Sequence, residues 1–396
     1  MEELLYQYNP WWEGQIDLAD IRPRQEHLDK ILSLASEKRV IFLTGLRRVG
    51  KTTLMHLFVD RLIKDGLQPK NIFYVSLDDY LLRNDAIVDI VAAYRKIHKL
   101  GVDKSVTLLL DEITYKENFQ QQLKNLVDRE NVTILASASS SSLLRDQKAF
   151  LTGRSATIEL RPLSFPEYMA FKKIHIAKRD QHLLDTYFGD YLRVGGLPEN
   201  VLQPSREYLM TLVDDVIQKD ITAFYGLKDP QVLRDYFTLL MERSGKQVSI
   251  NRISNILKIS PDTSRRYISY FEGTYLINLL PRWGNTNERL LSPKKVYACD
   301  LGIKYLFTGK RDLGSYFENY VYLQLRNQRQ LYYLYENGVE LDFLTEDNIL
   351  IEAKYNAELR GEQLKAFNSY PAKRKYLINS VKSLSVLDEL FESGSN

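Results

Sequence analysis

Several features of secreted and membrane proteins are missing from this chain. Only one of its 396 residues, Cys299, is a cysteine, so no disulfide can form within the chain. No stretch reaches the roughly 18 consecutive apolar residues that suggest a membrane-spanning helix. The N-terminal segment "MEELLYQYNPWWEG" lacks the basic and then apolar order of a signal peptide. These absences predict a protein of the reducing cytoplasm that does not associate with membranes.

The chain also has little net charge. Its formal charge of +3 does not by itself indicate a polyanionic partner, but the charge is unevenly distributed. Residues 232–298 contain 11 Lys and Arg against 5 Asp and Glu, a local excess of six positive charges. A local basic region is the electrostatic signature of nucleic-acid contact. The chain has no internal repeat, and its length allows two or three domains.

A phosphate-binding loop is the clearest motif that is present. The apolar run 40–44 is followed by Gly45-x4-Gly50-Lys51-Thr52 and an amphipathic helix pattern, the strand, loop and helix order that a P-loop requires. Lys51 would reach the β- and γ-phosphates of ATP, and the Thr52 hydroxyl would ligate Mg2+. Arg48 either contacts phosphate or faces solvent or another subunit. The predicted nucleotide-contacting residues of the loop are Gly45, Arg48, Val49, Gly50, Lys51, Thr52 and Thr53.

A pair of acids follows a second buried strand. Residues 106–110, "VTLLL", have the pattern of a buried strand, and Asp111 and Glu112 come directly after them. Asp111 is expected to hold Mg2+, and Glu112 to polarise the attacking water, which predicts hydrolysis as well as binding. The competing interpretation is two exposed acids that cap a helix.

Further strands complete a predicted parallel α/β sheet. A strand candidate at 71–79 lies between the P-loop strand and the acidic strand in the sequence, which is typical of additional-strand P-loop NTPases. Other strand candidates are 131–139 and 156–160. Ser139, or alternatively Ser137, would sense the γ-phosphate, or either serine would cap a helix. Alternating strands and helices predict helices on both faces of the sheet.

Two longer segments carry a family resemblance. "LLRDQKAFLTGRSATIELRPLSFPEYMAF" and "YLRVGGLPENV", after the P-loop and the acid pair, resemble the AAA+ type ATPases of archaea and bacteria that carry a C-terminal domain of formerly unknown function. The resemblance covers nearly the whole chain. The segment "ASASSSS" departs from the Thr-Gly-Ser core that is more frequent in the family, which leaves the choice of sensor residue open.

The resemblance implies further site residues and an assembly. Arg154 would act as an arginine finger in a neighbouring subunit, which implies a homo-oligomer, with a hexamer favoured; alternatively it pairs locally. Gly195, Gly196 and Pro198 would lie near the adenine in a helical lid spanning 164–230. Arg193 would be a phosphate sensor.

Residues 231–290 have the pattern of a winged helix-turn-helix. Two helix patterns are followed by "PDTSRRYISYFEGTYLINLLPRW", which predicts a third helix and an extended apolar pair. The N-terminal residues of that third helix, Thr263, Ser264, Arg265 and Arg266, would then contact DNA. The alternative is that the domain acts as a protein–protein spacer.

The last region, 291–396, resembles the PD-(D/E)XK nuclease fold. An acid on a helix, Glu318, is followed by Asp342 and by Glu352-x-Lys354 on neighbouring strands, and then by a helix with Gln363. The resemblance implies that Asp342 and Glu352, with the Ala353 carbonyl, hold Mg2+ or Mn2+ on a scissile phosphate. Lys354 would activate water, Glu318 would assist a second metal, and Gln363 would orient Lys354 or a phosphate. The alternative is a degenerate nuclease fold that serves only for contacts.

Two functions of different class follow from this organisation. The first is an ATP-driven machine that binds, remodels, translocates or cuts DNA, with a fork, junction or end as the open choices of substrate. The second is an ATP-gated regulatory or assembly protein whose C-terminal parts only bind partners. The predicted domains are an ATPase core (1–163), a helical lid (164–230), a winged helix (231–290) and a nuclease-like domain (291–396).

Overall fold

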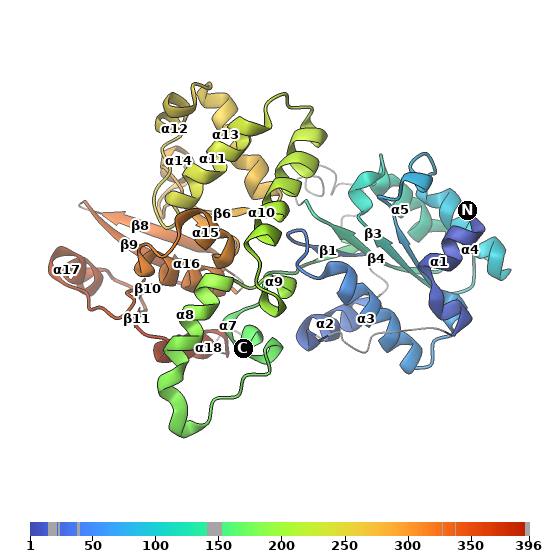
Figure 1. Ribbon diagram of the computed structural model, residues 1–396, viewed down its shortest axis with the longest axis horizontal. Coiled ribbons are helices and arrows are strands. Elements are labelled where there is room, and N and C mark those ends of the chain that lie inside the picture. The colour runs from blue at the N-terminus through green and yellow to red at the C-terminus, as the bar shows by residue number, and fades with distance from the viewer. Residues whose placement is uncertain are drawn as a thin grey trace. The chain divides into compact units, whose positions relative to one another are not determined.

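The computed structural model describes residues 1–14, 22, 24–37, 40–140, 153–326, 328–336 and 338–392 (Figure 1). Leu151 and Thr152 of the "LTGR" motif lie outside these residues. The chain folds as two compact units, unit 1 (Met1–Arg161) and unit 2 (Pro162–Asn396). This boundary falls beside the predicted end of the ATPase core, whereas the boundaries predicted near 230 and 290 lie inside unit 2 and stay predictions.

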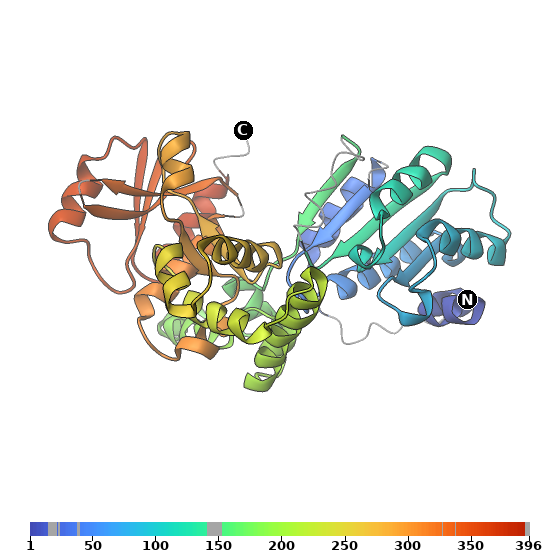
Figure 2. The same cartoon turned by 90° about the horizontal axis from the view of Figure 1, so that it is seen from above.

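Unit 1 is built on a five-stranded parallel sheet with the order β2-β3-β4-β1-β5. Its strands lie side by side in the view of Figure 2. They are β1 (Val40–Thr44), β2 (Ile72–Ser76), β3 (Val106–Asp111), β4 (Val132–Ala138) and β5 (Ser155–Glu159). The predicted parallel α/β sheet is therefore confirmed, and the carboxyl ends of its strands meet at one edge.

The strand between the P-loop strand and the acidic strand is β4, not the candidate at 71–79. Ala136 of β4 lies opposite Phe42 of β1 on one side and Leu110 of β3 on the other. The 71–79 candidate forms β2 at the sheet edge, where the Asn9 side chain exchanges two hydrogen bonds with the backbone of Tyr74. Sequence order did not give sheet order, because crossover connections can skip a neighbouring strand.

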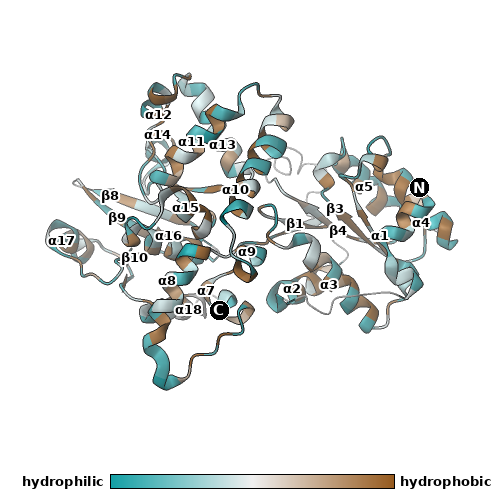
Figure 3. Cartoon of the chain, viewed as in Figure 1, coloured by the Kyte–Doolittle hydropathy of each residue, from teal (hydrophilic) through white to brown (hydrophobic). Residues whose placement is uncertain are grey.

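Helices cover both faces of this sheet (Figure 1). Leu108 and Leu110 of β3 pack on the face of α1, α4 and α5, whereas Leu109 packs on the face of α2 and α3. The alternation arises because successive side chains of a strand point to opposite faces. Figure 3 shows apolar residues along β3 and β4. The helices are α1 (Glu2–Tyr8), α2 (Gln25–Ser36), α3 (Lys51–Lys64), α4 (Ile87–His98) and α5 (Phe119–Arg129).

Unit 2 begins with helices. The first of them starts at a capping box, in which the Ser164 side chain accepts from the Glu167 N–H and the Glu167 side chain accepts from the Ser164 N–H. Helix α10 continues directly into a π-helical segment, η7 (Val216–Ala223). The helices in this part are α7 (Phe165–Phe171), α8 (Leu184–Val194), α9 (Pro198–Leu202) and α10 (Arg206–Asp215).

Four helices and strand β6 occupy the predicted winged-helix region, and β7 follows just beyond its predicted end at 290. Ser249 caps the second of these helices, where its hydroxyl accepts a hydrogen bond from the Arg252 N–H. The extended apolar pair expected within 261–283 is only one strand, β6, and its antiparallel partner β7 comes later, after α14. The elements are α11 (Pro230–Glu242), α12 (Ile250–Leu257), α13 (Pro261–Gly273), β6 (Ile277–Leu280), α14 (Thr286–Leu291) and β7 (Lys295–Ala298).

A four-stranded mixed sheet with the order β11-β10-β9-β8 forms the last part of unit 2. Strands β9 and β10 are antiparallel, as predicted, whereas β10 and β11 are parallel. The elements are α15 (Leu301–Thr308), α16 (Leu313–Leu325), β8 (Leu331–Glu336), β9 (Val339–Thr345), β10 (Ile349–Ala353), α17 (Gly361–Ser369), β11 (Arg374–Ile378) and α18 (Ser385–Glu392).

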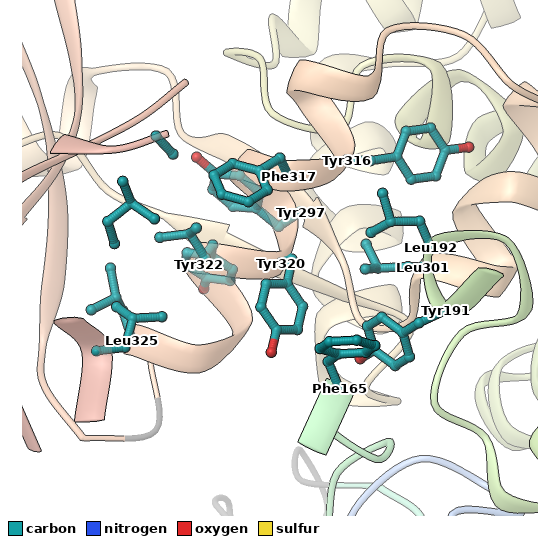
Figure 4. Close-up of a cluster of buried hydrophobic side chains, with 14 of the residues drawn as sticks. Phe165, Tyr191, Leu192, Tyr297, Leu301, Tyr316, Phe317, Tyr320, Tyr322 and Leu325 are labelled. Carbon is teal, nitrogen blue, oxygen red and sulfur yellow. The ribbon is translucent and has the colours of Figure 1, made fainter. Parts of the chain in front are cut away.

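One aromatic-rich core joins the early helices of unit 2 to the last sheet. It contains Phe165 and Tyr191 from the early helices, Tyr297 from β7, and Phe317 and Tyr320 from α16 (Figure 4). The predicted lid and nuclease-like regions therefore share one hydrophobic core. In the described part of the chain, no helix has the length and apolar character needed to cross a membrane.

Candidate functional site

The phosphate-binding loop connects β1 to α3 in unit 1. Gly45 has a φ of 141°, and a Cβ atom there would lie 2.1 Å from the Leu160 carbonyl oxygen, so only glycine fits. Gly50, with a φ of 101°, caps the start of α3 in a backbone conformation that glycine adopts without strain. The loop therefore turns directly into a helix N-terminus, where backbone N–H groups favour an anion.

Lys51 and Thr52, the first two residues of α3, have partners that suit nucleotide binding. The Lys51 ammonium donates to the carbonyl oxygens of Gly45 (3.0 Å) and Leu46 (3.1 Å), and the side chain is 5% exposed. The Thr52 hydroxyl donates to Oδ2 of Asp111 at 2.6 Å. A hydroxyl and a carboxylate that face each other are oxygen donors of the kind that Mg2+ prefers, so these two residues fit that ion.

Asp111 and Glu112 are held by serines of the neighbouring strand β4 and its end. The Ser137 hydroxyl donates to Oδ1 of Asp111 and accepts from the Glu112 backbone N–H at 2.9 Å. The Ser139 hydroxyl donates to Oε2 of Glu112 at 3.1 Å. Burial raises the pKa of Glu112, although the charge of Lys51 opposes this rise. Both serines thus position the acids, and contact of Ser139 with a γ-phosphate stays a prediction.

Tyr74 is a further member of this site that the sequence analysis missed. It lies on β2, and its hydroxyl donates to Oδ2 of Asp111 at 2.9 Å. Asp111 therefore accepts hydrogen bonds from Thr52, Ser137 and Tyr74. The signal in the sequence was a phenol within a buried apolar strand, because such a group usually needs a hydrogen-bond partner.

The other predicted residues of the loop differ in their surroundings. Val49 is fully buried in the core beneath the sheet, so only its backbone can face a phosphate. Thr53 is exposed. Arg48 has a positive φ of 61°, and the neighbouring Arg47 donates to the Tyr115 hydroxyl at 3.0 Å. Phosphate contacts of Arg48, Val49 and Thr53 stay predictions.

The predicted arginine finger, Arg154, and the predicted phosphate sensor, Arg193, both lie on the surface. Arg154 forms an ion pair with Asp128, which matches the local-pairing alternative, and its side chain remains 61% exposed. Arg193 pairs with Asp190 at 3.0 Å, one turn earlier in α8. Neither arrangement tests a role towards a neighbouring subunit or a nucleotide.

The Gly195–Gly196 pair has a packing role within unit 2. A Cβ atom on Gly196 would lie 2.2 Å from the Leu163 carbonyl oxygen, and one on Gly195 would lie 2.3 Å from Oδ1 of Asp300. The buried Asp300 side chain accepts from the Gly196 N–H at 2.7 Å and caps α15. Burial raises the pKa of Asp300 to about 6. Pro198 starts α9, and contact of Gly196 or Pro198 with adenine stays a prediction.

The predicted DNA-contacting residues of α13 divide into two groups. Arg265 and Arg266 are exposed, with Arg265 paired to Asp262 in the same helix. Ser264 is 0% exposed, and its hydroxyl lies 2.7 Å from the Tyr236 hydroxyl of α11. Ser264 therefore faces the helix bundle, and the expectation that it contacts DNA is corrected. The reason is helical periodicity, which turns it towards α11 while its two neighbours face outward.

The structure brings the predicted nuclease-like residues together in unit 2. The Asp342 N–H donates to Oε2 of Glu352 (3.0 Å), and the Ala353 N–H donates to Oδ2 of Asp342 (3.1 Å). Oε1 of Glu352 accepts from Gln363 at 2.5 Å and lies 3.2 Å from the Lys354 ammonium. Burial and the charge of Asp342 hold the pKa of Glu352 well above its ordinary value, against the effect of Lys354.

Lys295, which the sequence analysis did not assign to this cluster, lies among its carboxylates. Its ammonium is 2.7 Å from Glu318, 2.9 Å from Glu340 and 3.5 Å from Asp342, and the side chain is 0% exposed. Burial lowers the pKa of Lys295, but the surrounding carboxylates outweigh burial and hold it well above its ordinary value. No local signal in "SPKKVYACD" distinguishes Lys295 from the exposed Lys294 beside it.

The cluster does not fit a metal ion as it is arranged. Each oxygen of Asp342 and Glu352 has a protein donor or an ammonium within 3.5 Å. Within the residues that the structure describes, no three His, Cys, Asp or Glu side chains are grouped as metal ligands. Metal binding by Asp342, Glu352 and the Ala353 carbonyl therefore stays a prediction that this geometry does not favour.

Three protein families match successive parts of the chain. Residues 37–169 match a family described as AAA domain. Residues 185–313 match a domain of unknown function (DUF8612), and residues 313–391 match another (DUF4143). The first match covers the sheet of unit 1 with its P-loop and acid pair.

Similar proteins come from archaea and bacteria. An uncharacterized protein of Methanocaldococcus jannaschii is 26% identical over 92% of this chain and 85% of its own length. An uncharacterized protein of Haemophilus influenzae is 26% identical over 76% of this chain and 78% of its own length. Among solved structures, a Walker-type ATPase of Pyrococcus abyssi is 12% identical, with a TM-score of 0.46 over 74% of this chain and 99% of that one. By its family match and its parallel sheet, unit 1 is an AAA-type P-loop ATPase domain, and two domains of unknown function follow it.

Proposed function

We propose that the chain hydrolyses ATP at the loop of unit 1. The observation that carries this proposal is the convergence of Thr52 and Asp111 at 2.6 Å, beside a half-buried glutamate, Glu112, that Ser139 orients. Bound Mg2+, held by Thr52 and Asp111, would neutralise charge on the phosphates. Lys51 would add a second positive charge at the β- and γ-phosphates.

Glu112 is proposed as the residue that orients and deprotonates the attacking water. Its pKa is raised by burial, and a base whose pKa lies closer to the working pH accepts a proton more effectively. The backbone φ of 52° at Glu112 turns the chain immediately after β3, and Ser137 holds its N–H. These features fix the carboxylate relative to Asp111.

Two substitutions separate nucleotide binding from turnover. Lys51→Ala should abolish ATP binding, measured with a fluorescent ATP analogue, because the charge at the phosphates is lost. Glu112→Gln should bind ATP but release little phosphate, because an amide keeps the shape without acting as a base. The matched control is Lys64→Ala, at an exposed lysine of the same helix that pairs with Asp60. Turnover by Glu112→Gln at the parent rate would show that the base is assigned wrongly.

We further propose a homo-oligomer, with a hexamer favoured, in which Arg154 reaches the nucleotide of a neighbouring subunit. The support is the exposure of Arg154, whose partner Asp128 is itself on the surface. Mixing Arg154→Ala subunits with Lys51→Ala subunits should restore part of the ATPase activity, since each supplies what the other lacks. Absence of recovery in confirmed mixed assemblies argues against a finger in trans.

DNA is the proposed macromolecular partner of unit 2. The helices α11, α12 and α13 precede the antiparallel β6–β7 pair, and a single β-bridge links Gln247 to Lys295. This order of elements agrees with a winged helix, and Arg265 and Arg266 are exposed near the start of α13. Both arginines can contact phosphates there.

Salt dependence tests this surface. The double variant Arg265→Ala, Arg266→Ala should bind DNA more weakly and with a flatter dependence on salt. The reason is that the loss of two phosphate contacts reduces the number of counterions released on binding. Arg179→Ala is the control, since that exposed arginine lies outside the α11–α13 region. An unchanged salt slope in the double variant would favour protein–protein contact instead.

The C-terminal cluster bears on whether DNA is cut or only bound. Cleavage through Asp342, Glu352 and Lys354 requires carboxylate oxygens that can ligate a metal. Protein donors contact these oxygens, and Lys295 lies between three carboxylates. This arrangement favours the version of the proposal in which unit 2 binds without cutting, and with it the regulatory or assembly role as the second candidate function.

A further inference from the structure

Lys295 makes an unusually complete set of contacts for a buried cation. Its ammonium contacts one carboxylate from α16 (Glu318) and two from β9 (Glu340 and Asp342), at 2.7, 2.9 and 3.5 Å. Three carboxylates around one ammonium match its three N–H donors. The lysine itself comes from β7, so it joins three separate elements of unit 2.

The strand that carries Lys295 is fixed against α16. Tyr297, labelled with Tyr322 in Figure 4, is fully buried, and the two rings stack with centroids 4.1 Å apart. The Tyr297 hydroxyl donates to Glu318 at 2.7 Å. One residue further, the Asn319 side chain accepts from the Ala298 N–H (2.9 Å) and donates to the Ala298 carbonyl (3.0 Å). Asn319 thus pairs with β7 as another strand would, and it holds the backbone that positions Lys295.

We propose that Lys295 is a built-in cation of the C-terminal carboxylate cluster, and that it excludes a divalent metal ion and hence metal-dependent phosphodiester cleavage at this site. The ammonium lies where the carboxylates of Glu318, Glu340 and Asp342 converge. A metal ion bound there would face a positive charge at direct-contact distance. It would also have to displace a lysine that the chain tethers in position.

The competition between the two cations explains why the site needs no ion. A covalently tethered cation pays no entropy of association, so a free ion must compete against a partner that is always present. Once the ammonium is removed, three carboxylates converge with no cation in direct contact, although the charge of Lys354 still acts on two of them, Asp342 and Glu318. With the ammonium gone, these hard oxygen donors can move inward to the roughly 2.1 Å at which Mg2+ is bound. Removing Lys295 should therefore create a metal site that the parent lacks.

Mn2+ binding to the full-length protein, followed by the electron paramagnetic resonance signal of free Mn2+, tests this inference. All proteins carry Asp111→Asn, so that the P-loop of unit 1 does not hold the ion, and nucleotide is omitted. The parent should bind no Mn2+, whereas Lys295→Met should bind one ion per chain. Adding Asp342→Asn to Lys295→Met should remove that binding. Lys304→Met is the matched control, because it removes a buried lysine of unit 2 whose direct partner is Ser315, and it should bind no ion.

Two results would overturn the proposal. One is a parent protein that binds one Mn2+ in a manner that Asp342→Asn abolishes, or that cuts linear or branched DNA with the same dependence. The other is a folded Lys295→Met protein that gains no Mn2+ binding.

If Lys295→Met fails to fold, the double variant Lys295→Met, Glu318→Gln takes its place, because it leaves less uncompensated charge. If that variant also fails, the parent and its Asp342→Asn variant decide, and the absence of Asp342-dependent Mn2+ binding and cutting then supports the proposal. None of these measurements uses ATP hydrolysis, so failure of the proposed ATPase leaves them interpretable.

Discussion

The two units each bury a lysine beside acidic residues, but in different company. Lys51 of unit 1 donates to two neutral backbone carbonyls at the start of a helix. Lys295 of unit 2 lies among three carboxylates. These two carbonyl oxygens carry no formal charge, in contrast to the carboxylates around Lys295. Carboxylates of the protein itself compensate the charge of Lys295, so this charge is not available to bind an anionic ligand.

Lys304, also in unit 2, extends this comparison. Its ammonium donates to the Ser315 hydroxyl (2.7 Å) and carbonyl (2.9 Å) and lies 4.5 Å from the centre of the Tyr316 ring. Burial lowers the pKa of Lys304 to about 7, even though Glu318 and Asp312 oppose the shift. The pKa values of Lys295 and Lys304 are therefore shifted in opposite directions, because only Lys295 directly contacts carboxylates.

Removal of Lys295 should give the largest change in stability. Lys295→Met is expected to lower the free energy of unfolding of unit 2 by about 3–5 kcal/mol, the usual cost of leaving buried charges without their partner. Urea denaturation of the full chain, followed by tryptophan fluorescence and circular dichroism, measures it. Lys294→Met, at the exposed neighbouring lysine, should change stability by less than about 0.5 kcal/mol. Equal losses of unfolding free energy in Lys295→Met and Lys294→Met would show that the carboxylate contacts of Lys295 do not stabilise unit 2.

The Lys304 prediction concerns pH. The folded protein binds fewer protons at Lys304 than the unfolded chain between pH 7 and 10.5, so its stability rises with pH in this window. Relative to Lys304→Met, the parent should gain about 2 kcal/mol between pH 7 and pH 9. Thermal unfolding of both proteins at several pH values measures the difference. Parallel pH profiles would mean that Lys304 stays charged in the folded state.

The smallest expected effect concerns the acid that faces Thr52. Tyr74→Phe removes one hydrogen bond to Asp111, and the Mg2+ concentration for half-maximal ATPase activity should rise about tenfold, as for other residues that orient a metal ligand. Tyr8→Phe is the control, because the Tyr8 hydroxyl donates to Asp79 and not to Asp111. A reduced maximal rate with an unchanged Mg2+ requirement would assign Tyr74 a structural role only.

The sequence by itself determined the local features of this protein. Gly45, Gly50 and Lys51 form a loop between a strand and a helix, because glycine spacing and apolar runs encode backbone conformation directly. Asp111 ends β3, and Asp342 and Glu352 lie on antiparallel neighbours, because alternating and continuous apolar patterns mark the strands. Ser249 caps α12 for the same local reason.

Only the tertiary structure decided which of these elements meet. The insertion of β4 between β1 and β3, and the burial of Ser264 against Tyr236, depend on packing between distant segments. Lys295 shows this most clearly. Its strand pairs with β6, and its ammonium reaches carboxylates that lie 23, 45 and 47 residues later in the chain. No local pattern separates Lys295 from Lys294, because the partner of a charge is set by which elements pack together and not by the residues beside it.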